Sequence, residues 1–180
     1  MSPSPHPIPA SSTRNWIALA VLAVVILVIV VAVAGSKGGR SPEQSARAYI
    51  ETVQGDTSEV QDSVKAAQVV IASAISSPTS GKLHRLAQGA QTAYEEINSV
   101  HGSFAHPDTG NGLGKAQSEL FTAAEGLRNA MRSFVTYAGN PTPSARAQAA
   151  TGYRRAMAEW DRATTAIWRI ASLRDPPTVS

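Results

Sequence analysis

The chain of 180 residues contains no cysteine. Disulfide bridges, a lipid-modified cysteine and thiolate metal ligands are therefore excluded, and packing alone must hold the fold together. A strand-like alternation of apolar and polar residues is also missing, so the sequence does not predict a β-sheet.

Catalytic and cofactor motifs are missing as well. The sequence contains no P-loop, no Rossmann glycine pattern and no Gly-x-Ser-x-Gly or Ser-x-x-Lys motif. No glutamate is followed by a histidine three residues later, as a di-iron bundle would need. His84 and His101 are 17 residues apart, about 25 Å along one helix, so they cannot share a metal ion. We therefore expect no catalytic residue, no cofactor and no metal site.

The net charge of +3 does not indicate a nucleic-acid partner. All 13 acidic residues lie between Glu43 and Asp175, and 13 of the 16 basic residues lie in nearly the same range. The surplus consists of Arg14, Lys37 and Arg40, which flank an apolar run. Because the remaining region is neutral, a phosphate-binding face is not expected.

The strongest feature present is that run of 19 apolar residues, 16–34. As a helix it would rise about 28 Å, close to the ~30 Å hydrocarbon core of a bilayer. Trp16 suits one membrane interface, and Arg14, Lys37 and Arg40 suit the headgroup regions as membrane anchors. The sequence therefore predicts one transmembrane helix and a single-pass protein of the cell membrane.

A cleaved signal peptide is the alternative to an anchor, because Ala32-Val33-Ala34 resembles a cleavage site. The apolar run is longer than the usual h-region, and the first 15 residues hold one arginine, which favours the anchor. Positive charges flank both ends of the run, so they hardly decide its orientation. Long domains translocate largely regardless of charge, which favours an extracytoplasmic domain.

Polar and proline-rich segments surround the predicted span. Residues 1–15 have proline at every second position from Pro3 to Pro9, which predicts a disordered tail. Residues 35–40 are a glycine-rich linker, and residues 176–180 are a C-terminal tail.

Apolar residues between positions 41 and 175 recur in steps of three and four, which predicts amphipathic helices at about 42–76, 81–104, 113–138 and 143–173. The steps resemble those of a coiled coil. Short loops between them favour an antiparallel four-helix bundle, so the predicted fold is all-α. The four expected stripes are Ile50, Val53, Thr57, Val60, Val64, Ala67, Ile71 and Ala74; Leu83, Leu86, Ala90, Ala93, Ile97, Val100 and Phe104; Leu120, Ala124, Leu127, Met131, Phe134 and Ala138; and Ala149, Tyr153, Met157, Trp160, Thr164, Ile167 and Ala171.

Capping residues support these helix ends. Ser41 and Gln44 predict a capping box, and Thr142 with Pro143 predicts another N-terminus. Gly139 suits a C′ position with a left-handed backbone. Gly55 is the weak point of the first helix, because glycine destabilises a helix interior.

Charge predicts which helices are neighbours. The first helix holds five acidic residues, whereas the last region, 142–175, holds six arginines. Opposite charge should place these two helices side by side, although exposed ion pairs contribute under ~1 kcal/mol each. Trp168 lies beside the fourth stripe rather than on it, so it is our candidate contact residue.

These features favour a membrane-anchored, extracytoplasmic helical-bundle interaction module without catalytic activity. Its expected partners are membrane lipid through 16–34 and a protein partner, or a second copy, through the bundle. Besides an enzyme whose site carries no recognised motif, two alternatives stay open. One is a bundle that senses a small ligand through a membrane partner, an idea that rests on architecture alone. The other is a secreted helical protein, if residues 1–34 are cleaved.

Overall fold

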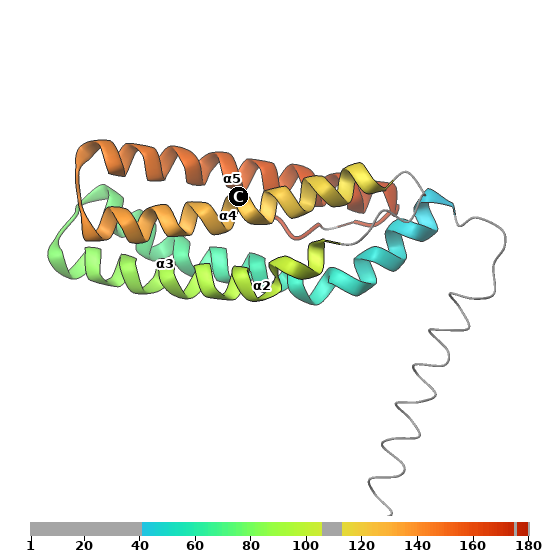
Figure 1. Ribbon diagram of the computed structural model, residues 1–180, viewed down its shortest axis with the longest axis horizontal. Coiled ribbons are helices and arrows are strands. Elements are labelled where there is room, and N and C mark those ends of the chain that lie inside the picture. The colour runs from blue at the N-terminus through green and yellow to red at the C-terminus, as the bar shows by residue number, and fades with distance from the viewer. Residues whose placement is uncertain (1–40, 106–112, 175, 180) are drawn as a thin grey trace, which may run out of the picture. The chain divides into compact units, whose positions relative to one another are not determined.

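The computed structural model describes residues 41–105, 113–174 and 176–179. Within these ranges the regular structure is helical, and Figure 1 shows four long helices packed together. They are α2 (Pro42–Ser76), α3 (Ser80–Val100), α4 (Gly114–Gly139) and α5 (Pro143–Ile170), with a short 3₁₀ helix, η1 (His101–Phe104), after α3. The prediction of an all-α fold with four packed helices is confirmed.

The predicted tail 1–15, span 16–34 and linker 35–40 lie outside the described residues, and so do the anchor residues Arg14, Trp16, Lys37 and Arg40. Among the helices of the described ranges, none combines the length and the apolar character that crossing a bilayer requires.

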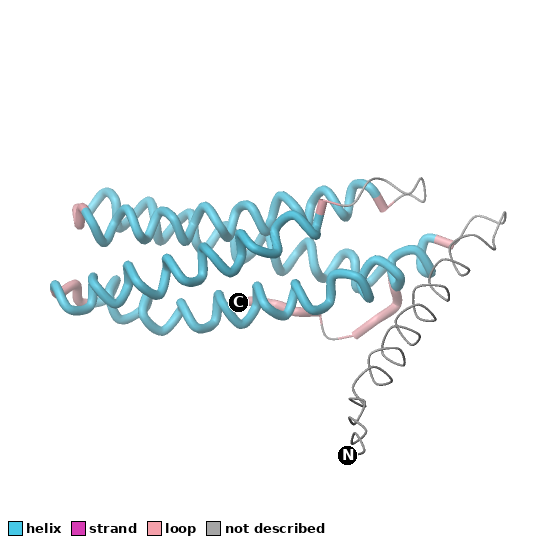
Figure 2. The backbone as a smooth tube through the Cα atoms, turned by 60° about the horizontal axis from the view of Figure 1, so that its bottom comes forward, coloured by secondary structure: helices cyan, strands magenta, loops and turns pink. Residues whose placement is uncertain are grey.

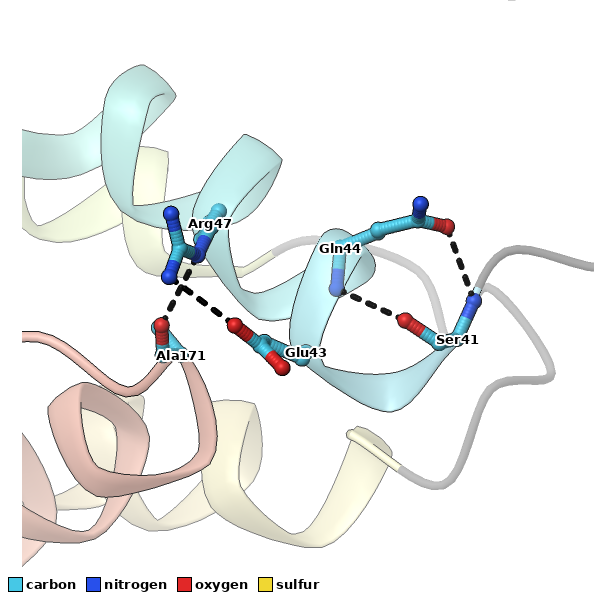
Figure 3. Close-up of polar contacts among 5 residues, drawn as sticks. All are labelled: Ser41, Glu43, Gln44, Arg47 and Ala171. Atoms are coloured by element: carbon cyan, nitrogen blue, oxygen red, sulfur yellow. Dashed lines mark hydrogen bonds and ion pairs between the residues drawn. The ribbon is translucent and has the colours of Figure 1, made fainter.

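The first and last helices begin at the predicted caps. The Ser41 hydroxyl accepts a hydrogen bond from the Gln44 N–H, and the Gln44 side chain accepts one from the Ser41 N–H, both at 3.2 Å (Figure 3). This reciprocal pair is the expected capping box. At α5, the Thr142 hydroxyl accepts from the Ala145 N–H at 3.1 Å, and Pro143 opens the helix. Both cap predictions are confirmed.

Three helix C-termini differ from the sequence-based ranges, and one of them is that of α5, which ends at Ile170 and not near residue 173. α3 ends at Val100, and residues 101–104 tighten into η1, whose Phe104 carbonyl accepts a hydrogen bond from the Tyr49 hydroxyl at 3.3 Å. Gly139 is the last residue of α4 and not its C′ residue. The next residue, Asn140, ends the helix with φ −139° while its N–H still donates to the Thr136 carbonyl, so no left-handed glycine is needed.

Most residues of the predicted stripes form the core, whereas Leu83, Val100, Ala138 and Met157 are only partly buried and pack against it. All eight stripe residues of α2 are buried, and α2 runs without a break past Gly55. Wide layers are filled by aromatic rings: Phe104 packs edge-on against Trp160, and Phe134 against Tyr153, with ring centroids 5.9 Å and 5.5 Å apart. The first contact joins η1 to α5 and the second joins the consecutive helices α4 and α5, so both tie separate elements of the bundle together.

α4 and α5 bury an additional row of small residues that the stripe analysis did not separate. The row consists of Ala116, Ala123 and Ala130 on α4 and Ala156 and Ala163 on α5. A Cβ atom added at Gly126 would lie 3.7 Å from the Ala156 Cβ atom. Small residues let the two backbones approach closely, and α4 and α5 accordingly share the most extensive contact between helices.

α2 and α5 are neighbours, as the prediction from charge required. Four ion pairs within the described ranges each link residues three or four apart on a single helix. Direct contact between α2 and α5 is sparser than between helices consecutive in the chain. The residues that follow α5 complete this side of the bundle.

Candidate functional site

The chain reverses direction directly after α5. The Leu173 N–H donates to the Trp168 carbonyl at 2.9 Å, and the Ser172 N–H donates to the Arg169 carbonyl at 3.1 Å. These two bonds define a Schellman motif, in which the residue after the cap adopts a left-handed conformation. Ser172 has φ 56°, a conformation that glycine adopts more easily than serine. This turn sends the chain back along the helix it has just left.

Arg47 holds the end of α5 against the start of α2. Its Nε–H donates to the Ala171 carbonyl at 2.9 Å, and its guanidinium pairs with Glu43 at 2.9 Å (Figure 3). A cation at a helix C-terminus stabilises the carbonyls that have no partner in the helix. The reversed chain therefore starts from a fixed point between the two helices.

Residues 176–179, which we call the C-terminal segment, lie against both α2 and α5, and Figure 2 shows this segment as a loop returning along the bundle. Side chains of both helices bind its backbone. From α2, the Gln61 amide donates to the Thr178 carbonyl at 2.7 Å, and the Gln68 amide donates to the Val179 carbonyl at 2.6 Å.

From α5, the Trp160 indole N–H donates to the Pro177 carbonyl at 2.8 Å, and the Val179 N–H donates to an Asp161 carboxylate oxygen at 2.7 Å. We call the surface formed by Gln61, Gln68, Trp160 and Asp161 the α2–α5 seam. Three consecutive carbonyls and one N–H of the segment are thus satisfied by side chains of the seam. This is the backbone pairing that a buried extended segment needs when it has no strand partner.

Along the C-terminal segment, buried apolar side chains alternate with a side chain that points towards solvent. Pro177 and Val179 are buried, Val179 at 1% exposure, whereas Thr178 between them is partly exposed. Alternation of this kind is the period of an extended chain with one face against the protein. The seam thus offers two buried positions for apolar side chains, two residues apart. We call the position of Pro177 the first socket and that of Val179 the second socket. The polar groups of the seam bind the backbone between them.

A buried hydroxyl lies near the Val179 end of the seam. Burial raises the pKa of Tyr153 to about 12, and the nearby Gln68 side chain lowers it by a smaller amount. The Tyr153 hydroxyl makes no hydrogen bond of standard geometry. The Gln68 amide, which binds the Val179 carbonyl, also approaches the Met157 sulfur at 3.5 Å. Burial of Tyr153 and Val179 therefore encloses this end of the seam.

The residues singled out from the sequence lie elsewhere. Trp168 is 6% exposed and belongs to the core, so its contacts are within the bundle. His101 is the C-cap of α3, and its ring packs against Phe121 at a tilt of 40°, with centroids 4.2 Å apart. Burial lowers the pKa of His101, and Arg128 lowers it further. Among the residues that the structure describes, no three His, Asp or Glu side chains are grouped for a metal ion.

Two surface hollows are weaker candidates. One of about 230 Å³ lies between α4 and α5 beside Glu119, Glu159 and Arg162. Its two carboxylates already pair with Lys115 and Arg155 on their own helices. The other lies between α2 and α3, is wide open, and is lined by several acidic residues. A small-ligand site is an enclosed pocket in which a few polar side chains converge, and neither hollow has that arrangement.

Sequence reasoning did not find the seam. Gln61 and Gln68 are seven residues apart, which places them on one face of α2. Glutamine on a helix surface is common, and nothing local indicates what it faces. The signal that was available is Pro176-Pro177 after the last helix, because two residues without N–H groups suit an extended segment against an apolar surface.

No protein family matches the chain, and neither a curated protein nor a solved structure shows significant similarity to it. The functional argument therefore rests on the seam and on the sequence.

Proposed function

We propose that the chain is a membrane-anchored interaction module whose α2–α5 seam binds extended peptide segments, without catalysing a reaction. The observation that carries this proposal is the C-terminal segment itself, held through four backbone hydrogen bonds and two buried side chains. A surface that binds backbone atoms and alternate side chains has the two elements of peptide recognition, affinity from the main chain and specificity from the sockets.

The preferred ligand follows from the chemistry of the seam. A proline in the first socket brings no N–H group, so it leaves no donor unsatisfied against the apolar wall. A β-branched residue two positions later fills the second socket, as Val179 does. We infer a ligand of the form Pro-x-Val or Pro-x-Ile in an extended conformation, carried by a protein partner or by a second copy of the chain.

The membrane part of the proposal rests on the sequence. Residues 16–34 are long and apolar enough for one helical span, and the short linker 35–40 would keep the bundle close to the lipid surface. The bundle then faces the extracytoplasmic side, where its seam meets other proteins. The neutral charge of residues 41–175 gives no support to a nucleic-acid partner.

A peptide-binding experiment tests the seam. The chain is ended after Leu173, purified in detergent and checked for helical structure by circular dichroism. A fluorescent peptide of residues 174–180 is then added, and its anisotropy is measured. We expect saturable binding, and about tenfold or more weaker binding of the peptide that carries Val179→Asp, because the second socket would have to bury a charge.

Matched protein variants give the control. Gln61→Ala with Gln68→Ala removes two hydrogen bonds of about 1 kcal/mol each, so affinity should fall roughly tenfold or more. Gln91→Ala on the exposed face of α3 should leave affinity unchanged, since its amide bonds only to Glu95. The proposal is wrong if the folded, shortened chain binds neither peptide, or binds both equally.

A further inference from the structure

The structure shows the seam filled by the chain's own residues, and three features bear on whether they always come from the same copy. The first is complementarity. The four hydrogen bonds that hold the backbone of the C-terminal segment all join it to α2 or α5, and none of them depends on how the segment is connected to its own α5. A second copy presents an identical segment, which fits the same seam with the same bonds.

The second feature is the connection. The segment leaves α5 through Ser172, whose φ of 56° is disfavoured for a residue with a Cβ atom. If the connection opened, this residue could relax to an extended conformation while the segment kept its contacts elsewhere. Short connections held in a disfavoured conformation are where segment exchange between identical chains begins.

The third feature is Leu173, one of two large apolar side chains that the described residues leave exposed, at 39%. In a Schellman motif the residue at this position often packs back on its helix, but here it stays partly open to solvent. It lies in the connecting stretch, where two copies would cross if they exchanged segments. A second copy would cover it there.

We propose that two copies of the chain exchange their C-terminal segments reciprocally, so that residues 176–179 of one copy fill the α2–α5 seam of the other. The inference rests on the proposed function, because it uses the seam as a peptide site and names a second copy as the partner. Anchoring in one membrane would favour the exchange, since it confines the copies to one surface and raises their effective concentration.

Chemical crosslinking tests the exchange, and the absence of cysteine from the chain makes it specific. The donor is the full chain with Thr178→Cys and an affinity tag. The acceptor carries Gln61→Cys and ends after Leu173, so its seam has no segment of its own. The two are mixed in detergent and treated with a short thiol–thiol crosslinker. We expect a donor–acceptor heterodimer, because the Gln61 side chain contacts the residue 178 backbone.

Two controls separate exchange from random collision. A donor that also carries Val179→Asp should give about tenfold less heterodimer, because its segment cannot enter the second socket. A donor with its cysteine moved to Ser99, on the exposed surface of α3, should give as little. In a second arm of the experiment, the acceptor is the full chain with Gln61→Cys. This acceptor keeps its own C-terminal segment, so the result does not depend on whether the shortened chain folds.

The outcomes distinguish the two proposals. Heterodimer in both arms that is lost with Val179→Asp supports exchange. If the chain carrying both Gln61→Cys and Thr178→Cys crosslinks only within itself, and no heterodimer forms in either arm, exchange is refuted. In that case a cysteine-bearing peptide of residues 174–180 that still crosslinks to the acceptor keeps the seam as a peptide site for another partner. If that peptide does not crosslink either, both proposals are refuted, the exchange and the peptide-binding function of the seam.

Discussion

At the scale of single residues, the bundle buries polar groups in two different ways. Thr164 bonds to the Trp160 carbonyl one turn earlier at 3.0 Å, so its hydroxyl is satisfied within α5. Tyr153 is 6% exposed, yet its hydroxyl has no hydrogen bond of standard geometry. Burial makes the Tyr153 hydroxyl resist ionisation, because its phenolate would lose solvent and the nearby Gln68 side chain offsets only part of that loss.

Tyr153 therefore makes the stability of the fold depend on alkaline pH. Burial raises its pKa from 10.0 to about 12 in the folded chain. Below pH 10 the phenol is neutral in both states and its contribution is complete. As the pH rises from 10 towards 12, the unfolded chain ionises while the folded chain does not, so stability is lost, on the order of 2 kcal/mol at the upper end. Urea unfolding at pH 9, 10, 11 and 12 measures this loss.

The same unfolding experiment on the Tyr153→Phe variant isolates the contribution of the Tyr153 hydroxyl. At neutral pH the substitution should change the free energy of unfolding by less than about 0.5 kcal/mol, because the hydroxyl it removes is unsatisfied. Above pH 10 the variant should lose less stability than the original chain. Burial also raises the pKa of Tyr49, so some loss remains in both. Equal losses in the two chains between pH 10 and pH 12 would contradict the assignment.

At the scale of helices, Gly55 in α2 and Gly89 in α3 illustrate opposite environments. A Cβ atom added at Gly55 would meet nothing within 4 Å. One added at Gly89 would lie 2.8 Å from a methyl carbon of Val70, where α3 crosses α2. Valine is stiff at χ1, so its methyl group cannot easily move away. The same substitution should therefore have opposite effects at the two positions.

Gly55→Ala should raise the free energy of unfolding by about 0.5–1 kcal/mol, because alanine is the better helix residue and nothing obstructs it. Gly89→Ala should lower it by about 1 kcal/mol or more, because overcrowding outweighs the gain in helix propensity. Adding Val70→Ala to the second variant should recover most of the loss. Thermal and urea unfolding decide the matter, and an equal gain at both glycines would show that α2 and α3 are not in close contact at Gly89.

The helices also show how far the sequence could predict the fold. Periodic stripes and caps are local signals, so the eight buried residues of α2 and the capping box at Ser41 could be anticipated. The buried alanine row of α4 and α5 could not be anticipated, because alanine is common on every helix face and its burial depends on which helix approaches. The seam could not be predicted for a related reason, because Gln61 and Thr178 are 117 residues apart in the sequence. A segment of four residues is also too short to show a periodic pattern of apolar residues.

At the scale of the whole molecule, the sequence divides into an apolar part and a neutral, water-compatible part. The bundle buries its own apolar stripes, and its described residues leave only two large apolar side chains exposed, Val69 and Leu173. The apolar residues at 16–34 have no such stripe pattern, because every position is apolar. A helix that is apolar on all sides has to be buried in lipid or in protein, and lipid is our prediction.

Two charges in the middle of this run test that prediction. Val25→Arg with Val28→Arg adds about 2.5–3.5 kcal/mol per residue to the free energy of insertion, which largely cancels the apolar gain of the run. The original chain should stay with membranes after alkaline carbonate washing, and the variant should move to the aqueous fraction. Ser11→Arg with Ser12→Arg adds the same charge outside the run and should leave the chain in the membrane.

The mass of the chain recovered from each fraction separates an anchor from a signal peptide. If the membrane-bound chain still carries residues 1–34, the apolar run holds it there, because no other part of the sequence combines that length with that apolar character. A chain that begins at Gly35 and is found in the aqueous fraction indicates cleavage and a secreted bundle. Recovery of the intact chain in the aqueous fraction would refute both readings, since 19 exposed apolar residues are then tolerated in water.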